Sequence, residues 1–278
     1  MVPKVAGSSP VVRPSYLGFL VEFLKAIFLG IIQGLTEFFP ISSSAHLKLI
    51  KYIFNVDFGR DNILFDLVCH LGTILASIIF LRLEVKKIIK DKHSIFLFFV
   101  AILPLFFFYF FLKPYIVFFS DIFYLPFFLF FSSILLFYIS KKDFKKQTIP
   151  YKKKIKDVFF IGIMQSLALL PGISRSASTI SSAHIRGWDI KESIKFSFLL
   201  SIPTILGGSF LESFKIFLKK EPIEISYIPL VLAFIFSFGV GLLCIRYIFK
   251  IDSSKKLKPF AIYLLLLSFF SFIYININ

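Results

Sequence analysis

Long apolar stretches, separated by short polar and basic segments, dominate the chain from residue 63 to its end. Six of them approach the roughly 20 apolar residues that a helix needs to cross the hydrocarbon core of a membrane. They are residues 63–81, 95–112, 115–139, 194–211, 227–249 and 260–275. Because these stretches are apolar all round and lack the period-two alternation of a barrel strand, we interpret each as one transmembrane helix.

Two further apolar regions, residues 17–50 and 158–185, are interrupted by proline, serine and charged side chains. They form a weak repeat, because Ile-Gln-Gly-Leu at 32–35 resembles Met-Gln-Ser-Leu at 164–167, and a proline and a serine-rich run follow each copy. The similarity continues downstream, where residues 70–75 align with residues 201–206 at an offset of 131 residues. Two matches at nearly one offset indicate an internal duplication.

If each broken region is a hairpin that enters and leaves the membrane on one side, three crossings separate the two copies. An odd number of crossings inverts the second copy, which is typical of proteins whose paired broken helices build a site near the midplane. The predicted fold class is all-α and polytopic, with about six transmembrane helices and two re-entrant broken helical hairpins in an inverted-topology repeat. We expect a single integral membrane domain at 17–278, with repeats at about 17–139 and 158–278, a basic cytoplasmic loop at 140–157 and an N-terminal tail of unknown order at 1–16.

The composition indicates that lipid is the main solvent. Hydrophobic residues make up 57% of the chain, which contains 41 Phe and has a mean hydropathy of +0.85, more than a water-facing surface tolerates. The formal net charge of +16 comes largely from basic clusters at 82–92, 141–156 and 250–258. We interpret these clusters as cytoplasmic segments by the positive-inside rule, with both termini outside, and expect no nucleic-acid partner. Cys69 and Cys244 lie within apolar stretches, so we expect neither a disulfide nor a metal site there.

The first broken region contains a carboxylate at membrane depth. Gln33 and Glu37 are four residues apart and share one helix face, and Pro40 ends that helix. Ser42, Ser43 and His46 then follow the break, where hydroxyls suit the capping of free amides. A buried carboxylate is costly in a membrane, so Glu37 is predicted to be functional and to line a cavity. An imidazole can act as an acid, a base or a nucleophile at phosphorus, which makes His46 a candidate catalytic residue.

The second broken region contains a lone arginine among hydroxyl residues. Arg175 follows a Pro-Gly break, and it is flanked by Ser174, Ser176, Ser178 and Thr179. A guanidinium fork fits phosphate oxygens two at a time, and hydroxyls and amides at a helix N-terminus favour an anion. The sequence therefore predicts phosphate binding by this segment. A structural ion pair between Glu37 and Arg175 is the alternative, and the two roles are compatible.

Three other histidines carry weaker signals. His70 lies within a predicted span beside Leu71 and Gly72, so we expect it to pack or to line the cavity wall, with contact to the site as the less favoured alternative. His93 and His184 lie near predicted loops and are assigned no role.

At these residues the sequence resembles the undecaprenyl-diphosphate phosphatases, a bacterial family also called the bacitracin-resistance proteins. The resemblance lies in Gln-Gly-Leu-Thr-Glu-Phe-Phe-Pro-Ile-Ser-Ser-Ser-Ala-His at 33–46 and in Pro-Gly-Ile-Ser-Arg-Ser-Ala-Ser-Thr at 171–179, and it extends over residues 65–74 and 196–208. It implies removal of the terminal phosphate of undecaprenyl diphosphate at the outer face of the bacterial inner membrane. That reaction recycles the lipid carrier for peptidoglycan synthesis and confers bacitracin resistance. Membrane lipid is the other expected partner, and a homodimer is left open.

The resemblance also implies roles for individual residues. The catalytic set is Glu37, Ser43, His46 and Arg175, and the substrate-binding set is Gln33, Ser42, Ser174, Ser176 and Thr179. A divalent cation, Mg²⁺ or Ca²⁺, is expected to bridge diphosphate oxygens and to be held partly by Glu37 with Gln33, since hard cations prefer oxygen ligands. Either Ser43 attacks phosphorus with His46 or Glu37 as base, or His46 attacks directly. Ala45 and Ala177 stand where the family usually has glycine, at matching places in the two halves.

Two other readings compete with the phosphatase. An inverted-repeat secondary transporter or lipid-phosphate flippase would also place polar residues at the midplane. Arginine, serine and histidine beside a lone carboxylate suit phosphoryl chemistry better than cation coupling. The type-2 phosphatidic acid phosphatase family fails on spacing, because the next histidine after Arg175 is His184, too far along the chain for that pattern.

Overall fold

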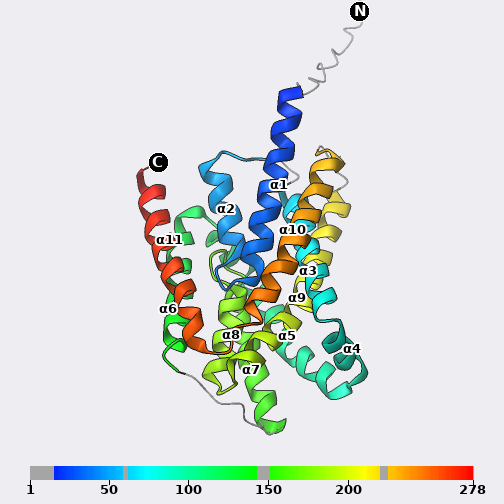
Figure 1. Cartoon of the computed structure of the whole chain (residues 1–278), viewed down its shortest axis with the longest axis vertical. Helices are drawn as coiled ribbons and strands as arrows, with labels where there is room; N and C mark the ends of the chain where they lie inside the picture. The colour runs from blue at the N-terminus through cyan, green and yellow to red at the C-terminus, as the bar shows by residue number, and fades with distance from the viewer. Residues whose placement is uncertain (1–15, 59–61, 143–150, 220–224, 278) are drawn as a thin grey trace, which may run out of the picture.

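The computed structural model describes residues 16–58, 62–142, 151–219 and 225–277, and helices make up most of these residues (Figure 1). The helices are α1 (Tyr16–Phe38), α2 (Ser43–Ile53), α3 (Asn62–Phe80), α4 (Arg82–Lys90), α5 (Lys92–Phe118), α6 (Leu125–Ile139), α7 (Tyr151–Leu167), α8 (Arg175–Ile185), α9 (Ile190–Lys219), α10 (Tyr227–Ile248) and α11 (Lys258–Ile277). Short 3-10 turns, η2 (Ile122–Tyr124) and η3 (Ser254–Leu257), precede α6 and α11. The predicted all-α class is confirmed.

Six helical stretches among the described residues are long and apolar enough to cross a membrane. They are Asn62–Phe80, Lys92–Phe111, Ile122–Ile139, Ile190–Leu218, Tyr227–Ile248 and Ser254–Ile277, one for each predicted span. One predicted boundary is wrong, because α5 continues through Pro114 to Phe118 and the next crossing starts at Ile122 instead of residue 115. Membrane helices tolerate proline where neighbouring groups satisfy the freed backbone, so Pro114 does not end the helix.

The predicted basic loop at 140–157 is also partly helical, because α7 already begins at Tyr151. Its Asp157 is fully buried and accepts hydrogen bonds from Arg186 Nε (2.6 Å) and Trp188 Nε1 (3.0 Å). These two donors come from the end of α8 and the segment after it. The two hydrogen bonds of this buried carboxylate therefore hold the first half of α7 against the segment that follows α8.

Each broken region forms a hairpin of two helices, α1 with α2 and α7 with α8. The α1–α2 hairpin enters from the end of the molecule where α11 stops, and the α7–α8 hairpin enters from the opposite end (Figure 1). Their turns meet, because Ser176 Oγ donates a hydrogen bond to the Phe39 carbonyl (3.2 Å). The helix α4, the start of α7 and the basic η3 segment lie toward the end away from the start of α1 (Figure 1).

Two close helix crossings lie at equivalent positions of the two halves. A side chain at Gly30 of α1 would meet the Ala233 carbonyl oxygen of α10 at 2.7 Å, and a side chain at Gly162 of α7 would meet the Ala101 carbonyl of α5. Gly30 and Gly162 are 132 residues apart in the chain, and so are Ala101 and Ala233. Each hairpin's first helix thus packs against a helix of the other half at an equivalent position.

Candidate active site where the two hairpins meet

The turn between α1 and α2 places Ser43 beside the end of α1. After α1 ends at Phe38, Ser42 adopts φ 69°, a left-handed conformation that residues other than glycine rarely take. The chain then reverses and α2 begins at Ser43. Strained backbone of this kind occurs mainly where the surrounding structure needs it, often at functional sites.

Glu37 is the centre of the site. Its side chain is 8% exposed, and both carboxylate oxygens accept hydrogen bonds. Arg175 Nη2 donates to Oε1 (2.6 Å), while Ser43 Oγ (2.6 Å) and Gln33 Nε2 (3.1 Å) donate to Oε2. The burial is compensated by one cation and two neutral donors, as a charge at membrane depth requires. The structure thus brings Gln33, Glu37, Ser43 and Arg175 into one cluster.

Arg175 is the first residue of α8, and the preceding turn positions it. Gly172 has φ 113° in the α7–α8 turn, where a side chain would also meet Phe128 Cβ at 2.7 Å, so this position requires glycine. Ser174 is the N-cap of α8, and its hydroxyl accepts from Ala177 N (3.2 Å). The Arg175 side chain is 15% exposed and also donates from Nη1 to the Ser197 carbonyl (3.4 Å).

His70 of α3 lines a cavity, as the sequence predicted, and it also contacts the Glu37 cluster, which was the less favoured alternative. Its Nδ1 accepts a hydrogen bond from Gln33 Nε2 (2.9 Å) and lies 3.5 Å from Glu37 Oε2. Since an amide nitrogen only donates, Nδ1 must be the accepting nitrogen in this arrangement. The signal in the sequence was a polar residue in the middle of an apolar span, inside the second repeated segment.

His46 points away from the Glu37 cluster. Its Nδ1 is 2.8 Å from the Ser42 carbonyl, and its Nε2 is 2.7 Å from the Tyr263 hydroxyl of α11, on whose ring it also stacks. Both ring nitrogens are therefore engaged, and Glu37 is the titratable side chain that Ser43 contacts. No feature of the sequence identified Tyr263.

The hydroxyls around Arg175 are mostly satisfied inside the fold. Ser176 Oγ contacts the Phe39 carbonyl and Ser174 Oγ, and Ser174 N bonds to Ser132 Oγ (3.0 Å). Thr179 Oγ1 lies 2.6 Å from Ser197 Oγ and 2.9 Å from the Arg175 carbonyl, which joins α8 to α9. In this arrangement these side chains position the start of α8, and their predicted contact with substrate stays a prediction.

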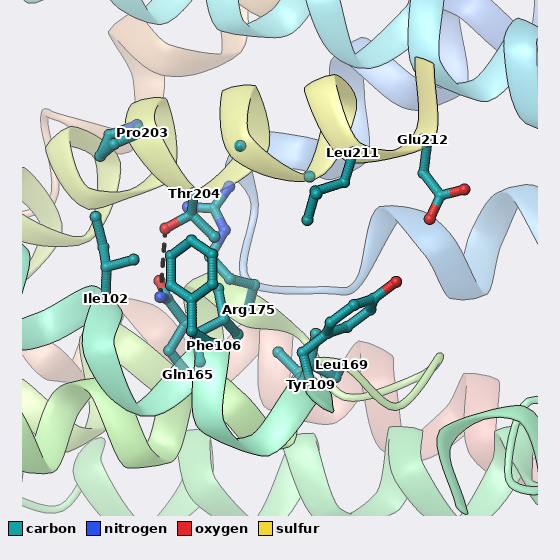
Figure 2. Close-up of a pocket in the computed structure, with 14 residues that line it drawn as sticks. Ile102, Phe106, Tyr109, Gln165, Leu169, Arg175, Pro203, Thr204, Leu211 and Glu212 are labelled. Atoms are coloured by element: carbon teal, nitrogen blue, oxygen red, sulfur yellow. Dashed lines mark hydrogen bonds between the residues drawn. The ribbon is translucent and has the colours of Figure 1, made fainter. Parts of the chain in front are cut away.

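A cavity of about 250 Å³ lies between α5, α7 and α9, and we call it the α5–α9 cavity (Figure 2). Arg175, Gln165 and Thr204 supply polar groups near its middle, and Tyr109 and Glu212 lie toward one end (Figure 2). The rest of the lining is mostly apolar: Ile102, Leu105, Phe106, Ala168, Leu169, Pro203, Gly207, Gly208 and Leu211. A guanidinium at the side of an apolar cavity fits an anion carried on a hydrocarbon chain.

A second cavity of about 340 Å³ lies between α3 and α9, and we call it the α3–α9 cavity. His70 and Asp66 line it from α3, and Ser209 and Glu212 line it from α9. Asp66 pairs with Lys51 Nζ at 2.7 Å. The Glu37 cluster therefore has one largely apolar cavity on its Arg175 side and another on its His70 side.

The residues present can hold a divalent cation only together with substrate. Among the described residues there is no group of three His, Cys, Asp or Glu side chains that could hold a metal. Glu37 supplies one carboxylate, and the adjacent Gln33 Oε1 is buried with no hydrogen-bond partner in the described part of the chain. Mg²⁺ is commonly bound by one or two carboxylates plus substrate phosphates, so this donor pair fits a cation that binds with a diphosphate.

Known proteins resemble this chain in sequence. The family model described as bacitracin resistance protein BacA matches residues 26–270, which include the turns of both hairpins. The chain belongs to this family. An undecaprenyl-diphosphatase of Protochlamydia amoebophila (strain UWE25) is 41% identical over 255 residues, covering 90% of this chain and 97% of that protein. One from Prochlorococcus marinus (strain MIT 9312) is 36% identical over 267 residues, covering 89% and 97%. One from Bacteroides fragilis (strain YCH46) is 32% identical over 257 residues, covering 87% and 94%.

Membership of the bacitracin resistance family favours a phosphatase over the transporter or flippase alternative, because these relatives are named diphosphatases. Six helices capable of spanning a membrane agree with a multi-pass membrane protein. Ala45 and Ala177, the two alanines at family glycine positions, are both fully buried in the first turn of α2 and α8. Neither belongs to the Glu37 cluster, so these methyl groups leave its hydrogen bonds intact.

Proposed function

We propose that this protein hydrolyses undecaprenyl diphosphate to undecaprenyl phosphate and inorganic phosphate. The observation that carries the proposal is the cluster in which Glu37 touches both Ser43 Oγ and Arg175 Nη2 at 2.6 Å. A hydroxyl held on a carboxylate is an activated nucleophile, and a guanidinium beside it can neutralise phosphoryl oxygens. Family membership supports the same activity, since the relatives compared are named undecaprenyl-diphosphatases.

In the proposed first step, Ser43 Oγ attacks the terminal phosphorus and Glu37 Oε2 takes the hydroxyl proton. The bond from phosphorus to the bridging oxygen breaks, and undecaprenyl phosphate leaves. Arg175 turns from Glu37 toward the phosphoryl oxygens as Glu37 becomes neutral, because the ion pair then loses its anion. Most of the catalysis in phosphoryl transfer is positioning and charge neutralisation, which this cluster of one base and one guanidinium supplies.

A divalent cation bound with substrate would be held by Glu37 and Gln33 Oε1 and would add charge neutralisation on the diphosphate oxygens. Gln33 suits this role because its Nε2 is committed to Glu37 and to His70, which leaves Oε1 as the free acceptor. Ser42, Ser174 and Ser176 would complete the phosphate environment after Arg175 moves.

The isoprenoid chain would lie in the α5–α9 cavity, which is largely apolar and has Arg175 in its wall. Exposed phenylalanines on α5, including Phe106, Phe107 and Phe110, continue this apolar surface toward lipid. We place the protein in the bacterial inner membrane with the basic α4 and η3 segments in the cytoplasm. The site would then open to the periplasmic face, the side on which α1 begins and α11 ends.

The test is phosphate release from purified protein and a long-chain isoprenyl diphosphate labelled in its terminal phosphate. We expect release without any ion gradient and a phosphoenzyme that is stable in acid, as phosphoserine is. Ser43→Ala should abolish both signals, and Ser44→Ala, at the next position of α2, should keep them. An acid-labile phosphoenzyme would instead identify His46 as the nucleophile.

A further inference from the structure

Gln165 is a buried amide with one unused acceptor. Its side chain is 1% exposed, and Oε1 accepts no hydrogen bond from any residue that the structure describes. Thr204 Oγ1 donates its one proton to the Leu200 carbonyl (2.8 Å), so it can only accept a hydrogen bond from Gln165 Nε2 (3.3 Å). This contact sets the orientation of the Gln165 amide. A buried acceptor without a donor costs free energy, so a ligand that donates is expected beside Oε1.

The Gln165 side chain lines the α5–α9 cavity together with Arg175 (Figure 2). Gln165 is the repeat equivalent of Gln33, 132 residues away, and Leu169 stands at the position equivalent to Glu37. The second half thus keeps the glutamine but has a leucine at the position that corresponds to Glu37. Gln165 is therefore suited to position a neutral group and unsuited to act as a base.

The ligand for Oε1 must be a hydrogen-bond donor that fits between an amide and a phosphate. The isoprenoid chain has no donor, and a fully ionised diphosphate has only acceptors. Water has two protons, so it can donate one to Gln165 Oε1 and the other to a phosphoryl oxygen held by Arg175. Buried waters typically satisfy buried polar groups in this way.

The site also lies on the correct side for attack. In phosphoryl transfer the attacking and leaving oxygens lie roughly in line on opposite faces of phosphorus. Arg175 contacts Glu37 on the side of Ser43, and it lines the α5–α9 cavity on the side of Gln165. A phosphoryl group bound by Arg175 would therefore lie next to both the Glu37 cluster, which contains Ser43, and the cavity that Gln165 lines.

We propose that Gln165 binds the water molecule that hydrolyses the Ser43 phosphoenzyme. The water oxygen forms a bond to phosphorus while the bond from phosphorus to Ser43 Oγ breaks. Ser43 Oγ takes back the proton that Glu37 accepted in the first step, and both water protons leave on dihydrogen phosphate. This inference rests on the proposed function, because it concerns the second half of that reaction.

The experiment is rapid-quench kinetics on the full-length protein with terminally labelled isoprenyl diphosphate. Gln165→Met keeps the side-chain length but removes the acceptor. We expect a normal burst of isoprenyl phosphate, a turnover about 10- to 100-fold slower, as misplacement of a reacting group causes, and label accumulating on Ser43. Turnover within about twofold of the unmodified protein, or a slower turnover without accumulated label, would overturn the proposal.

Two further variants separate water binding from a structural brace. Thr204→Val breaks the same hydrogen bond between α7 and α9 but leaves Gln165 Oε1 in place. If the Gln165–Thr204 hydrogen bond only holds α7 against α9, Thr204→Val and Gln165→Met should slow turnover equally. If Gln165 binds water, at least several-fold more label should accumulate on Ser43 in Gln165→Met than in Thr204→Val. Ser166→Ala, which loses only a bond to the Gly162 carbonyl of its own helix, should behave like the unmodified protein.

Failure of the proposed function would give a different result. If the unmodified protein showed no phosphate release and no label on Ser43, the first step itself would be wrong. If it showed both and Gln165→Met matched it, the phosphatase would stand and only the role of Gln165 would be lost.

Discussion

The Glu37 carboxylate and the Arg175 guanidinium, 138 residues apart in the chain, form a 2.6 Å ion pair that joins the two inverted halves. Glu37 lies in the last turn of the first helix of one hairpin, and Arg175 begins the second helix of the other. Each charge compensates the other in a mostly buried place, and each is needed for the proposed chemistry. Stability and activity therefore depend on the same contact.

Arg175→Lys keeps the positive charge but loses the planar fork that binds two oxygens at once. We expect kcat for phosphate release to fall by about 100-fold or more, because a donor to the transition state is lost. The thermal unfolding temperature in detergent should stay near that of the unmodified protein. Arg175→Ala leaves Glu37 buried without a cation, and removing one partner of a buried pair costs about 3–5 kcal/mol. It should therefore unfold at a lower temperature, and retention of more than a tenth of the activity by either variant would contradict the site.

His70→Phe removes the acceptor for Gln33 Nε2 while keeping an aromatic ring in the wall of the α3–α9 cavity. Gln33 then has one orienting contact instead of two, so we expect kcat to fall by about tenfold, in keeping with the loss of a positioning contact. His93→Phe, at an exposed site near the start of α5, is the control and should keep full activity. Equal activities of the two variants in a phosphate-release assay would remove His70 from the site.

The helices and their pairing could be predicted from the sequence because lipid imposes a simple rule on apolar length. The six long apolar stretches correspond to six helices. The repeat around Gln33 and Gln165, with three crossings between its two copies, predicted that the second copy is inverted. The helix boundaries were less predictable. Proline often ends a helix, so the sequence predicted a break between two spans near Pro114, but this residue lies inside α5. The amphipathic α4 was missed for a related reason, since its basic residues were interpreted only as a topology signal.

The site residues that come from motifs were predictable, but their partners were not. Glu37 and Arg175 stood out because charges are rare at membrane depth. Tyr263 and Ser132 are ordinary residues in apolar stretches, and only the folded chain brings them to His46 and to Ser174 N. That Ser43 contacts Glu37, while His46 contacts Tyr263, likewise depends on distances that no spacing in the sequence supplies.

Gly30→Leu tests the inverted packing. The new side chain would meet the Ala233 carbonyl at 2.7 Å, a backbone atom that cannot move without shifting α10. We expect a loss of about 1–3 kcal/mol in stability, the usual cost of overpacking. Gly239→Leu is the control, because a side chain there meets nothing within 4 Å. Thermal unfolding in detergent should separate the two variants, and equal stability would argue against the α1–α10 crossing.

Removal of divalent cations should stop phosphate release, and adding Mg²⁺ or Ca²⁺ should restore it. Without the cation, the charge on the diphosphate oxygens is less well neutralised. We expect Glu37 to share the cation with Gln33 and the diphosphate, because one carboxylate alone is too weak a site. Gln33→Leu should therefore raise the cation concentration for half-maximal activity by about tenfold, within the range seen when a group that supports a metal is lost. Full activity in excess chelator would show that Arg175 suffices for charge neutralisation.

Gly207→Phe and Ser209→Phe test which cavity holds the isoprenoid chain. Gly207 lines only the α5–α9 cavity and Ser209 only the α3–α9 cavity, so the same bulky ring fills a different space in each variant. Nothing lies within 4 Å of a Cβ atom added at Gly207, so the backbone there has room for the first atom of a side chain.

Gly207→Phe should raise KM for a long-chain isoprenyl diphosphate by about tenfold or more, since a few lost methylene contacts at roughly 0.8 kcal/mol each suffice. A short-chain isoprenyl diphosphate reaches less of the cavity, so its KM should change much less. Ser209→Phe should leave the ratio of the two KM values unchanged. The opposite pattern, with Ser209→Phe discriminating by chain length, would place the chain between α3 and α9.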